Sequence, residues 1–489
     1  MPTARHWLSS FTAGALSVAA FAPWHLPWLL WLTFGLLWWL VAAYPRHGFR
    51  LGYAFGLGLF LAGVPWVYTS LHQFGGLIAP VAVVVTGLFA AFLALFPAVA
   101  CYAQGRLQPP PWLSPLLFTA CWVLAEWLRS WIFTGFPWLS LGYVLSDTPL
   151  RALFGVGGTW LASSVALWLA LVPAWLVRHR AARPLLPTLA LLAAATLAMA
   201  VQPRTRPVAP GLSVALLQGN YSQDIKWDPE WIPRQIAWYR QTTLAQRAEL
   251  ILWPETAVPG STVAAAPWLE RLHTQLLQRG QGALIGIIDR QDDKLYNALL
   301  GLGTLQGRYH KVHLVLLGEY FPMRRWLKLL PGLSIPASDF THGDPAQPSL
   351  RLGGTTLLGN ICYEDVFGNE MRQRTRSFPS AGLWINASND AWFGRTAPWQ
   401  HLQMARMRAV ENGRPMLRVT NTGITAVIAA DGRVQSSLPP FEQGVLTATV
   451  HPRIDETWFL RFGNSWVLMG HALLLLVGYG QKRAWHSGV

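Results

Sequence analysis

The chain has 489 residues, of which 52% are hydrophobic and 12% are charged, and its formal net charge is +15. Three cysteines do not make a disulfide framework, so a disulfide-stapled scaffold is excluded. In a soluble protein a charge of +15 would suggest nucleic-acid binding, but here the basic residues border apolar segments, which indicates a membrane protein instead.

The first two hundred residues form a succession of apolar segments with only two acidic side chains, Glu126 and Asp147. A helix needs about 20 mostly apolar residues to cross about 30 Å of hydrocarbon. We therefore expect seven transmembrane helices before the polar part of the chain and an eighth after it. These spans are predicted near 7–23, 27–44, 51–71, 78–103, 112–131, 157–177, 185–201 and 465–480. The first could also be read as a cleaved signal peptide, but further spans follow at once, which favours a retained helix.

Basic residues mark one end of these spans: Arg5, Arg46, Arg50, Arg106, Arg178, Arg180, Arg183, Lys482 and Arg483. The positive-inside rule places that end in the cytoplasm. Seven crossings from a cytoplasmic N-terminus then deliver residues 205–460 to the outer side, and the eighth returns the C-terminus. Six or eight spans before the polar part would invert this arrangement. The bias is incomplete, because the expected outer side carries Arg129, Arg151, Arg204 and Arg206.

The polar part alternates short β-branched or apolar segments with amphipathic ones, which predicts a layered α/β domain of about 240 residues. Expected strands are 212–217, 249–253, 283–288, 297–302, 355–361, 382–387, 416–420, 424–429 and 444–450. Expected helices are 229–247, 263–279, 365–375 and 400–412. Asp431-Gly432, between two strand-like segments, predicts a hairpin turn.

Three places in this domain carry a reactive side chain. Cys362 follows the strand 355–361, and Glu255 follows the strand 249–253, so both lie at carboxyl ends of strands, where α/β sheets usually present reacting groups. Glu255 could serve as a general base, and Lys311 could stabilise the oxyanion of a tetrahedral intermediate. Taken singly, each has a simpler interpretation: a buried structural cysteine, a solvated loop glutamate and a surface lysine. Cys101 and Cys121 lie in predicted spans and are most simply small packing residues.

Taken together, the three places resemble the nitrilase, or carbon–nitrogen hydrolase, superfamily. Its members carry a Glu–Lys–Cys triad in this order on an αββα sandwich, and the local sequences WPE (253–255), YHKVHLVLLGEY (309–320) and NICYED (360–365) match as well. The resemblance implies that Glu255, Lys311 and Cys362 are catalytic. It also implies that Glu319 is the additional glutamate near the thiol.

The membrane half narrows the resemblance to the family of apolipoprotein N-acyltransferases, in which a nitrilase-like domain lies between seven N-terminal spans and one C-terminal span. The most specific stretch runs from 388 to 409, and 226–228 is also similar. The implied fold is an α-helical transmembrane bundle of about eight spans with an extracytoplasmic αββα sandwich. The implied domains are a membrane domain (1–204), a nitrilase-like catalytic domain (205–460), and a C-terminal transmembrane helix with a cytoplasmic tail (461–489).

This resemblance implies a two-step reaction without metal or nucleotide cofactors. Glu255 would take the proton of Cys362, whose thiolate attacks a phospholipid ester while Lys311 holds the oxyanion. Phosphatidylethanolamine is the expected donor. The α-amine of a diacylglyceryl-cysteine at the start of a lipoprotein would then take the acyl chain from the thioester. The implied location is the inner membrane of a Gram-negative-type cell, with the catalytic domain in the periplasm and both termini in the cytoplasm.

The resemblance also makes Trp227, Tyr363 and Glu364 candidates for lining the pocket or gating entry, with packing around the nucleophile as the alternative for the last two. Residues 321–333 mix cations with large apolar groups, which predicts either a membrane-dipping arm or an amphipathic helix on its own core. Glu126 lies one turn from Arg129, so local charge pairing near the membrane surface is expected.

Two other functional classes fit parts of the sequence. A membrane-anchored amidase or nitrilase would release the acyl group to water through the same thioester. A transporter would carry ionisable residues along its spans, and the predicted spans lack such a path.

Overall fold

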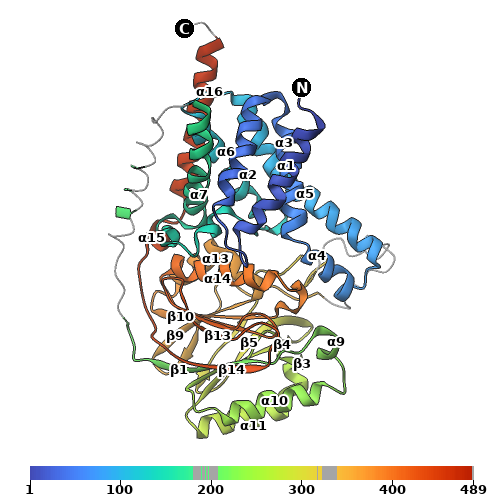
Figure 1. Ribbon diagram of the computed structural model, residues 1–489. Helices are drawn as coiled ribbons and strands as arrows, with labels where there is room; N and C mark the ends of the chain where they lie inside the picture. Colours follow the sequence, from blue (N-terminus) through green and yellow to red (C-terminus); the bar gives the residue numbers. More distant parts are fainter. Residues whose placement is uncertain are drawn as a thin grey trace. The chain divides into compact units, whose positions relative to one another are not determined.

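The computed structural model describes residues 1–179, 207–316, 318–321 and 339–486, together with 189, 193, 196 and 197. The chain divides into two compact units (Figure 1). The helical unit comprises Met1–Tyr68, Ala79–Gln202 and Arg461–Val489, and the α/β unit comprises Thr69–Ile78 and Pro203–Leu460. Most of the expected span 185–201 and of the expected arm 321–333 lies outside the described residues.

The helical unit contains a helix in each expected span that the structure describes. These are α1 (Ala4–Ser17), α2 (Leu29–Ala43), α3 (Gly48–Gly63), α5 (Ala79–Leu107), α6 (Ser114–Arg129), α7 (Phe154–His179) and α16 (Ser465–His486). Only two segments of the described chain, Ala79–Leu107 and Pro149–Arg178, are long and apolar enough to cross a membrane. Their number is at most three, if Leu29–Ala43 and Pro45–Gly63, bent by 112°, form one crossing. Eight spans are therefore not confirmed, because helices such as α1 (14 residues) and α6 (16 residues) fall short of about 20 residues.

Small residues let α3 and α5 approach each other closely. Gly52 of α3 faces the backbone of Pro97 and Ala98 in α5, and one turn further along Gly56 faces Ala94. A Cβ at Gly52 would lie 2.5 Å from the Pro97 carbonyl oxygen, so no larger residue fits without separating the helices. This is the small-residue packing that joins helices in lipid, where burial of apolar surface contributes little.

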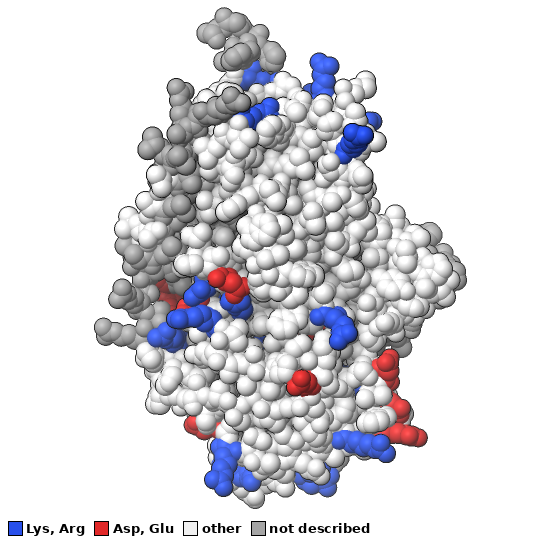
Figure 2. Space-filling model, in the orientation of Figure 1, with Lys and Arg blue, Asp and Glu red and all other residues white. Residues whose placement is uncertain are grey.

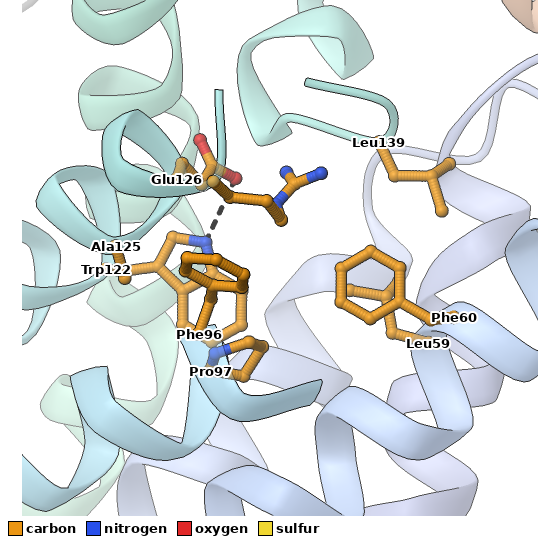
Figure 3. A pocket seen from close by; sticks show the side chains of 9 residues that line it. Leu59, Phe60, Phe96, Pro97, Trp122, Ala125, Glu126 and Leu139 are labelled. Carbon is orange, nitrogen blue, oxygen red and sulfur yellow. Dashed lines mark hydrogen bonds between the residues drawn. The ribbon is translucent and has the colours of Figure 1, made fainter. Parts of the chain in front are cut away.

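Glu126 and Arg129 are both buried in the helical unit and bind the loop that follows α6. The Glu126 carboxylate accepts hydrogen bonds from the Trp122 indole (3.1 Å), the Leu141 backbone N–H (2.9 Å) and the Ser163 hydroxyl (2.7 Å). The Arg129 guanidinium donates to the carbonyl oxygens of Phe136 and Trp138. Both side chains line a narrow apolar pocket with room for about one water molecule (Figure 3). The charges of Glu126 and Arg129 interact, as expected, and their hydrogen bonds also make a buried network that fixes a loop.

The outside of the helical unit is apolar. Large hydrophobic side chains are exposed along it, among them Trp31, Leu32, Val83, Val84, Leu88, Leu473 and Leu476. Figure 2 shows few charged side chains over these helices, with Lys and Arg gathered toward one end of them. Lys482 and Arg106 meet there, because the Lys482 ammonium donates to the Arg106 carbonyl. An apolar exterior of this extent is typical of a surface that faces lipid.

The α/β unit contains two sheets, each with seven strands among the described residues. The first has the order β14 (Gly444–Val450), β1 (Leu212–Gln218), β2 (Leu250–Leu252), β4 (Gly282–Gln291), β5 (Lys294–Gly303) and β7 (Arg308–His310), with β3 (Val258–Ser261) paired to β4. The second has the order β13 (Val434–Ser437), β12 (Ala426–Ile428), β11 (Met416–Thr420), β10 (Ala381–Ser388), β9 (Thr355–Ile361), β8 (Leu350–Leu352) and β6 (Leu305–Gln306). Both sheets have a parallel centre, β1-β2-β4 in one and β9-β10-β11 in the other.

Three apolar clusters lie between the four layers of the α/β unit, which are two sheets and two pairs of helices. One cluster joins the two sheets and includes Leu252 of β2, Ile361 of β9 and Val419 of β11. A second lies between the first sheet and the helices α10 (Ile232–Ala245) and α11 (Thr262–Gln278). A third lies between the second sheet and the helices α13 (Gly368–Ser377) and α14 (Ala397–Asn412). Figure 1 shows the helix pairs on opposite sides of the sheets, so this unit is an αββα sandwich, as expected.

The segment Thr69–Ile78 belongs to the α/β unit although it lies between helices of the other unit in sequence. Its short π-helix η3 (Ser70–Phe74) contacts η8 (Asp390–Phe393). The Ser70 hydroxyl donates to the Trp392 carbonyl (2.6 Å), and the Phe74 ring meets the Trp392 indole edge-on at 5.3 Å. No motif in the sequence predicted this contact.

Candidate active site

Three strand ends bring the predicted residues to one place. Glu255 lies three residues after β2, Lys311 directly follows β7, and Cys362 directly follows β9. The two sheets that carry these strands share one apolar core, so the strand ends of both sheets converge. The Lys311 backbone N–H still pairs with the Asn297 carbonyl of β5 (2.8 Å), which fixes where the lysine side chain begins.

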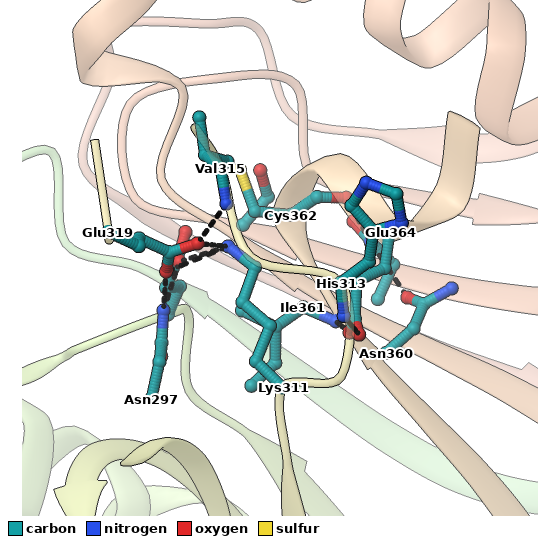
Figure 4. Close-up of polar contacts among 12 residues, drawn as sticks. Asn297, Lys311, His313, Val315, Glu319, Asn360, Ile361, Cys362 and Glu364 are labelled. Atoms are coloured by element: carbon teal, nitrogen blue, oxygen red, sulfur yellow. Dashed lines mark hydrogen bonds and ion pairs between the residues drawn. The ribbon is translucent and has the colours of Figure 1, made fainter. Parts of the chain in front are cut away.

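Lys311 lies between two carboxylates. Its ammonium is 2.9 Å from Glu319 Oε2 and 3.5 Å from Glu255 Oε1, and the lysine is almost fully buried (Figure 4). Burial opposes its charge, but Glu319 and Glu255 outweigh that effect and raise the pKa of Lys311 above its ordinary value. Lys311 is therefore a permanent cation at neutral pH. Such a group can hold an oxyanion but cannot act as a base.

Asn297 of β5 joins the two carboxylates and was not predicted from the sequence. Its amide group donates to Glu255 Oε1 (2.7 Å) and to Glu319 Oε1 (2.8 Å). The second oxygen of Glu319 accepts the Val315 backbone N–H (2.9 Å). Glu319 is thus held by three donors and Glu255 by two, which leaves Glu255 with more accepting capacity for a proton.

Cys362 begins a tight turn, η7 (Cys362–Val366), and has φ = 52°, a left-handed conformation that is uncommon for a residue with a side chain. Its carbonyl accepts a hydrogen bond from the Asn386 amide (3.1 Å). The residue is 5% exposed. Burial, together with the charge of Glu255, raises the pKa of the Cys362 thiol well above its usual value, while Lys311 acts in the opposite direction. At rest the sulfur is therefore a neutral thiol that needs a base to become a nucleophile.

Glu364 stabilises the turn through hydrogen bonds to its carboxylate. Its carboxylate accepts hydrogen bonds from the Ile361 N–H (2.7 Å), the Val312 N–H (2.7 Å), the His313 N–H (3.0 Å) and the Tyr309 hydroxyl (2.9 Å). Burial raises the pKa of Glu364 to about 7. These bonds tie the segment after β7, which carries Lys311, to the segment that carries Cys362. The contacts favour packing around the nucleophile over pocket lining for this residue.

The other two candidates differ in their placement. Tyr363 is buried, and its ring meets Phe367 edge-on at 5.2 Å and His313 at 6.3 Å. Trp227 is 48% exposed, so its indole is available to a ligand.

A buried ionic network lies beneath the turn, formed by Arg418, Asp365, Asp390 and His401. Arg418 is 2.9 Å from each aspartate and donates to Asn386 (2.7 Å), which in turn holds Cys362. Burial and Arg418 oppose the charge of His401, but the two aspartates prevail and raise its pKa. With His401 protonated, the network carries two positive and two negative charges. Asp365, Asp390 and His401 fall in the stretches 360–365 and 388–409 that carry the resemblance, but Arg418 was not predicted.

Comparison with known proteins shows where this architecture occurs. A family model described as "Apolipoprotein N-acyltransferase N-terminal domain" matches residues 13–172, and one described as "Carbon-nitrogen hydrolase" matches residues 213–457. The apolipoprotein N-acyltransferase of Methylococcus capsulatus is 41% identical over 477 residues, which cover 95% of this chain and 93% of that protein. The chain belongs to the apolipoprotein N-acyltransferase family.

A second apolipoprotein N-acyltransferase supports the assignment. The apolipoprotein N-acyltransferase of Nitrosomonas europaea is 38% identical over 485 residues, 96% of each chain. Among solved structures, an amidase from Nesterenkonia sp. is 18% identical and covers 54% of this chain and 98% of its own, with a TM-score of 0.38. Membership in the apolipoprotein N-acyltransferase family assigns the chain to lipoprotein maturation as an acyltransferase associated with the membrane.

Proposed function

We propose that the chain moves an acyl chain from a phospholipid to the N-terminal α-amine of a diacylglyceryl-cysteine lipoprotein, through a thioester on Cys362. The observation that carries this proposal is the Lys311 ammonium, held between Glu255 and Glu319 next to a buried thiol. In this proposal Glu255 is the base, Lys311 is the oxyanion-stabilising cation and Cys362 is the nucleophile, and the burial of all three supports a desolvated site.

In the first half-reaction, Glu255 takes the thiol proton and the Cys362 sulfur attacks the ester carbonyl. Lys311 stabilises the oxyanion of the tetrahedral intermediate. The C–O bond of the ester then breaks, and the leaving alkoxide receives the proton from Glu255. A thioester and a lysophospholipid result. Asn297 and Glu319 hold the base and the lysine in place throughout.

In the second half-reaction, the neutral α-amine of the acceptor attacks the thioester carbonyl. Glu255 takes a proton from the attacking nitrogen and returns it to the departing Cys362 thiolate. The amide bond forms as the C–S bond breaks, so the enzyme returns to its starting state. Hydrolysis would follow the same path with water in place of the amine, so the two reactions differ only in the second nucleophile.

The membrane arrangement belongs to this proposal. Phosphatidylethanolamine is the proposed donor, and the proposed catalytic domain, 205–460, lies in the periplasm. Residues 1–204 and 461–489 would anchor it in the inner membrane with eight spans and both termini in the cytoplasm. The apolar exterior of the helical unit supports a lipid setting for both substrates.

Kinetics of single variants test the proposed roles. In bilayers that contain phosphatidylethanolamine and a diacylglyceryl-cysteine peptide, we expect Glu255→Gln to lower kcat by about 10²–10⁴-fold, as loss of a general base does. We expect Lys311→Met to lower it by about 10²–10³-fold, as loss of an oxyanion donor does. The exposed residues Glu230 and Lys294 supply matched controls, Glu230→Gln and Lys294→Met. Wild-type rates in the site variants would contradict the assignment.

A further inference from the structure

A second buried lysine lies beside the proposed site. Lys226 ends the short helix α9 (Gln223–Lys226), is 3% exposed, and donates from Nζ to the backbone carbonyl of Glu255 (3.2 Å). Gln235 of α10 fixes the end of α9, because its amide donates to the carbonyls of Ile225 (3.2 Å) and Lys226 (3.1 Å). The Glu255 carbonyl thus positions the ammonium of Lys226, and Gln235 positions its backbone.

Lys226 is poorly compensated where it lies. An ammonium has three N–H donors, and among the described residues Lys226 uses one of them, on a neutral carbonyl. Its electrostatic partners are the Glu255 carboxylate and the Cys362 sulfur. Burial lowers the pKa of Lys226 to about 8, against the opposing effect of these two groups. A buried cation in this state gains most from a new negative charge nearby.

The proposed reaction creates such a charge. When Glu255 takes the thiol proton, Glu255 becomes neutral and the negative charge moves to the Cys362 sulfur. Lys311 also acts on the thiol, but its ammonium is shared with Glu319 at 2.9 Å. Lys226 already interacts with both the group that loses the charge and the group that gains it.

We propose that Lys226 is a second lysine of the acyl-transfer site, and that its ammonium stabilises the Cys362 thiolate that forms when Glu255 takes the thiol proton. The S–H bond breaks, an O–H bond forms on Glu255, and Lys226 keeps its own proton. The proposal rests on the proposed function for its catalytic meaning. Its physical content, a cation that favours the thiolate, is measurable without any acyl donor.

A purely structural role is the alternative, in which Lys226 only fastens α9 to the loop after β2. The pH dependence of thiol reactivity separates the two roles, because a residue with only a structural role does not change the pKa of the thiol. The charged and titratable groups that face the thiol from the surrounding elements are Glu255, Lys311, Asp390, Arg418 and Lys226.

The experiment measures the rate at which iodoacetamide alkylates Cys362 in the full-length protein. Peptide mass spectrometry monitors the alkylation at each of a series of pH values. The proteins are wild type, Lys226→Met, Lys226→Arg and the exposed-site control Lys294→Met. We expect Lys226→Met to react about tenfold more slowly at neutral pH, because loss of a cation worth about one unit of thiol pKa lowers the thiolate fraction about tenfold. Lys226→Arg should restore the neutral rate, and Lys294→Met should match wild type.

The faster alkylation of wild type relative to Lys226→Met should disappear as pH rises through about 8, where Lys226 loses its proton. Lys226→Arg should remain faster than Lys226→Met above this pH, because arginine keeps its charge. Coincident profiles for wild type and Lys226→Met would overturn the proposal, as would an arginine variant that behaves like the methionine variant. If Lys226→Met does not fold, the alkylation rates of wild type and Lys226→Arg are compared above pH 8. A higher rate for the arginine variant supports the proposal, and equal rates overturn it. Shifted profiles without any acyl transfer would overturn the proposed function alone.

Discussion

At the scale of single residues, the turn at Cys362 has a strained backbone that its neighbours hold in place. A left-handed conformation at a non-glycine residue costs on the order of 1–3 kcal/mol and persists only when its surroundings enforce it. Here Asn386 holds the Cys362 carbonyl, and Glu364 holds the backbone N–H of the preceding residue, Ile361. Figure 4 shows the thiol on the side of the turn where Lys311 and Glu319 lie, which fits the proposed role of Cys362.

Replacing Glu364 with glutamine should break this arrangement. The glutamine amide turns two donors toward groups that need acceptors, and each buried donor left unpaired costs about 1–3 kcal/mol. We expect Glu364→Gln to lower the thermal midpoint and to reduce acyl transfer at least tenfold, with both measured on the same preparation. The exposed control Glu442→Gln should change neither. Normal stability and activity of Glu364→Gln would contradict the structural role.

The network beneath the turn predicts a pH effect on stability. The folded-state pKa of His401 is raised above 6.5, so the protonated imidazole contributes stability that is fully present below about pH 6.5 and is lost as pH rises through the folded pKa. We expect the thermal midpoint of wild type to fall over that window. His401→Gln should start lower and show a smaller fall, whereas the exposed control His451→Gln should follow wild type. Equal slopes for wild type and His401→Gln would refute the assignment.

The motifs allowed Glu255, Lys311, Glu319 and Cys362 to be named from the sequence, because each sits in a distinctive local pattern. Asn297, Asn386 and Lys226 have no such pattern. The two asparagines are polar residues within apolar strands, and the sequence does not tell whether a strand residue faces a reactive group or a neighbouring strand. Only the pairing of β5 and β10 with their neighbours decides this.

At the scale of elements, all nine expected strands and four expected helices of the α/β unit are present, with shifts of a few residues at their ends. The Asp431-Gly432 turn also joins β12 to β13 as predicted. The strands that were missed are β3, β6, β7, β8 and β13, each of two to four residues. Such lengths are too short for a hydrophobic period to be read, and β7 carries the backbone that positions Lys311.

In the helical unit, the contact between α3 and α5 predicts a steric effect. Gly52→Leu should push the two helices apart, because the Pro97 carbonyl and Ala98 leave no space for a side chain. We expect a clearly lower thermal midpoint and less folded protein in the membrane. Gly87→Leu in α5 is the matched control, since nothing lies within 4 Å of a Cβ at Gly87. Equal stability of the two variants would contradict this packing.

At the scale of the whole molecule, composition alone separated an apolar half from a polar half. It could not count the spans. Several helices in the apolar half are shorter than the bilayer requires, and α2 and α3 meet at a bend of 112°. A hydropathy pattern records apolar length but not where a helix bends or stops, so the helix lengths of the described residues do not confirm the eight expected spans.

The proposed orientation is testable with single cysteines in a background without Cys101, Cys121 and Cys362. Asp293→Cys, in the exposed turn between β4 and β5, should react with a membrane-impermeant maleimide in intact spheroplasts. Gln481→Cys, exposed near the end of α16, should react only after the membrane is permeabilised. The opposite pattern would place the α/β unit in the cytoplasm and reverse the proposed topology.

The central claim is that Cys362 carries the acyl chain from lipid to amine. The most direct measurement is intact-protein mass spectrometry of wild type and Cys362→Ala after mixing with phosphatidylethanolamine of defined acyl chains, followed by addition of a diacylglyceryl-cysteine peptide. We predict one added acyl mass on wild type only, which then moves to the peptide amine. Loss of that mass to water would identify a hydrolase instead, and the absence of any Cys362-dependent adduct would contradict the account.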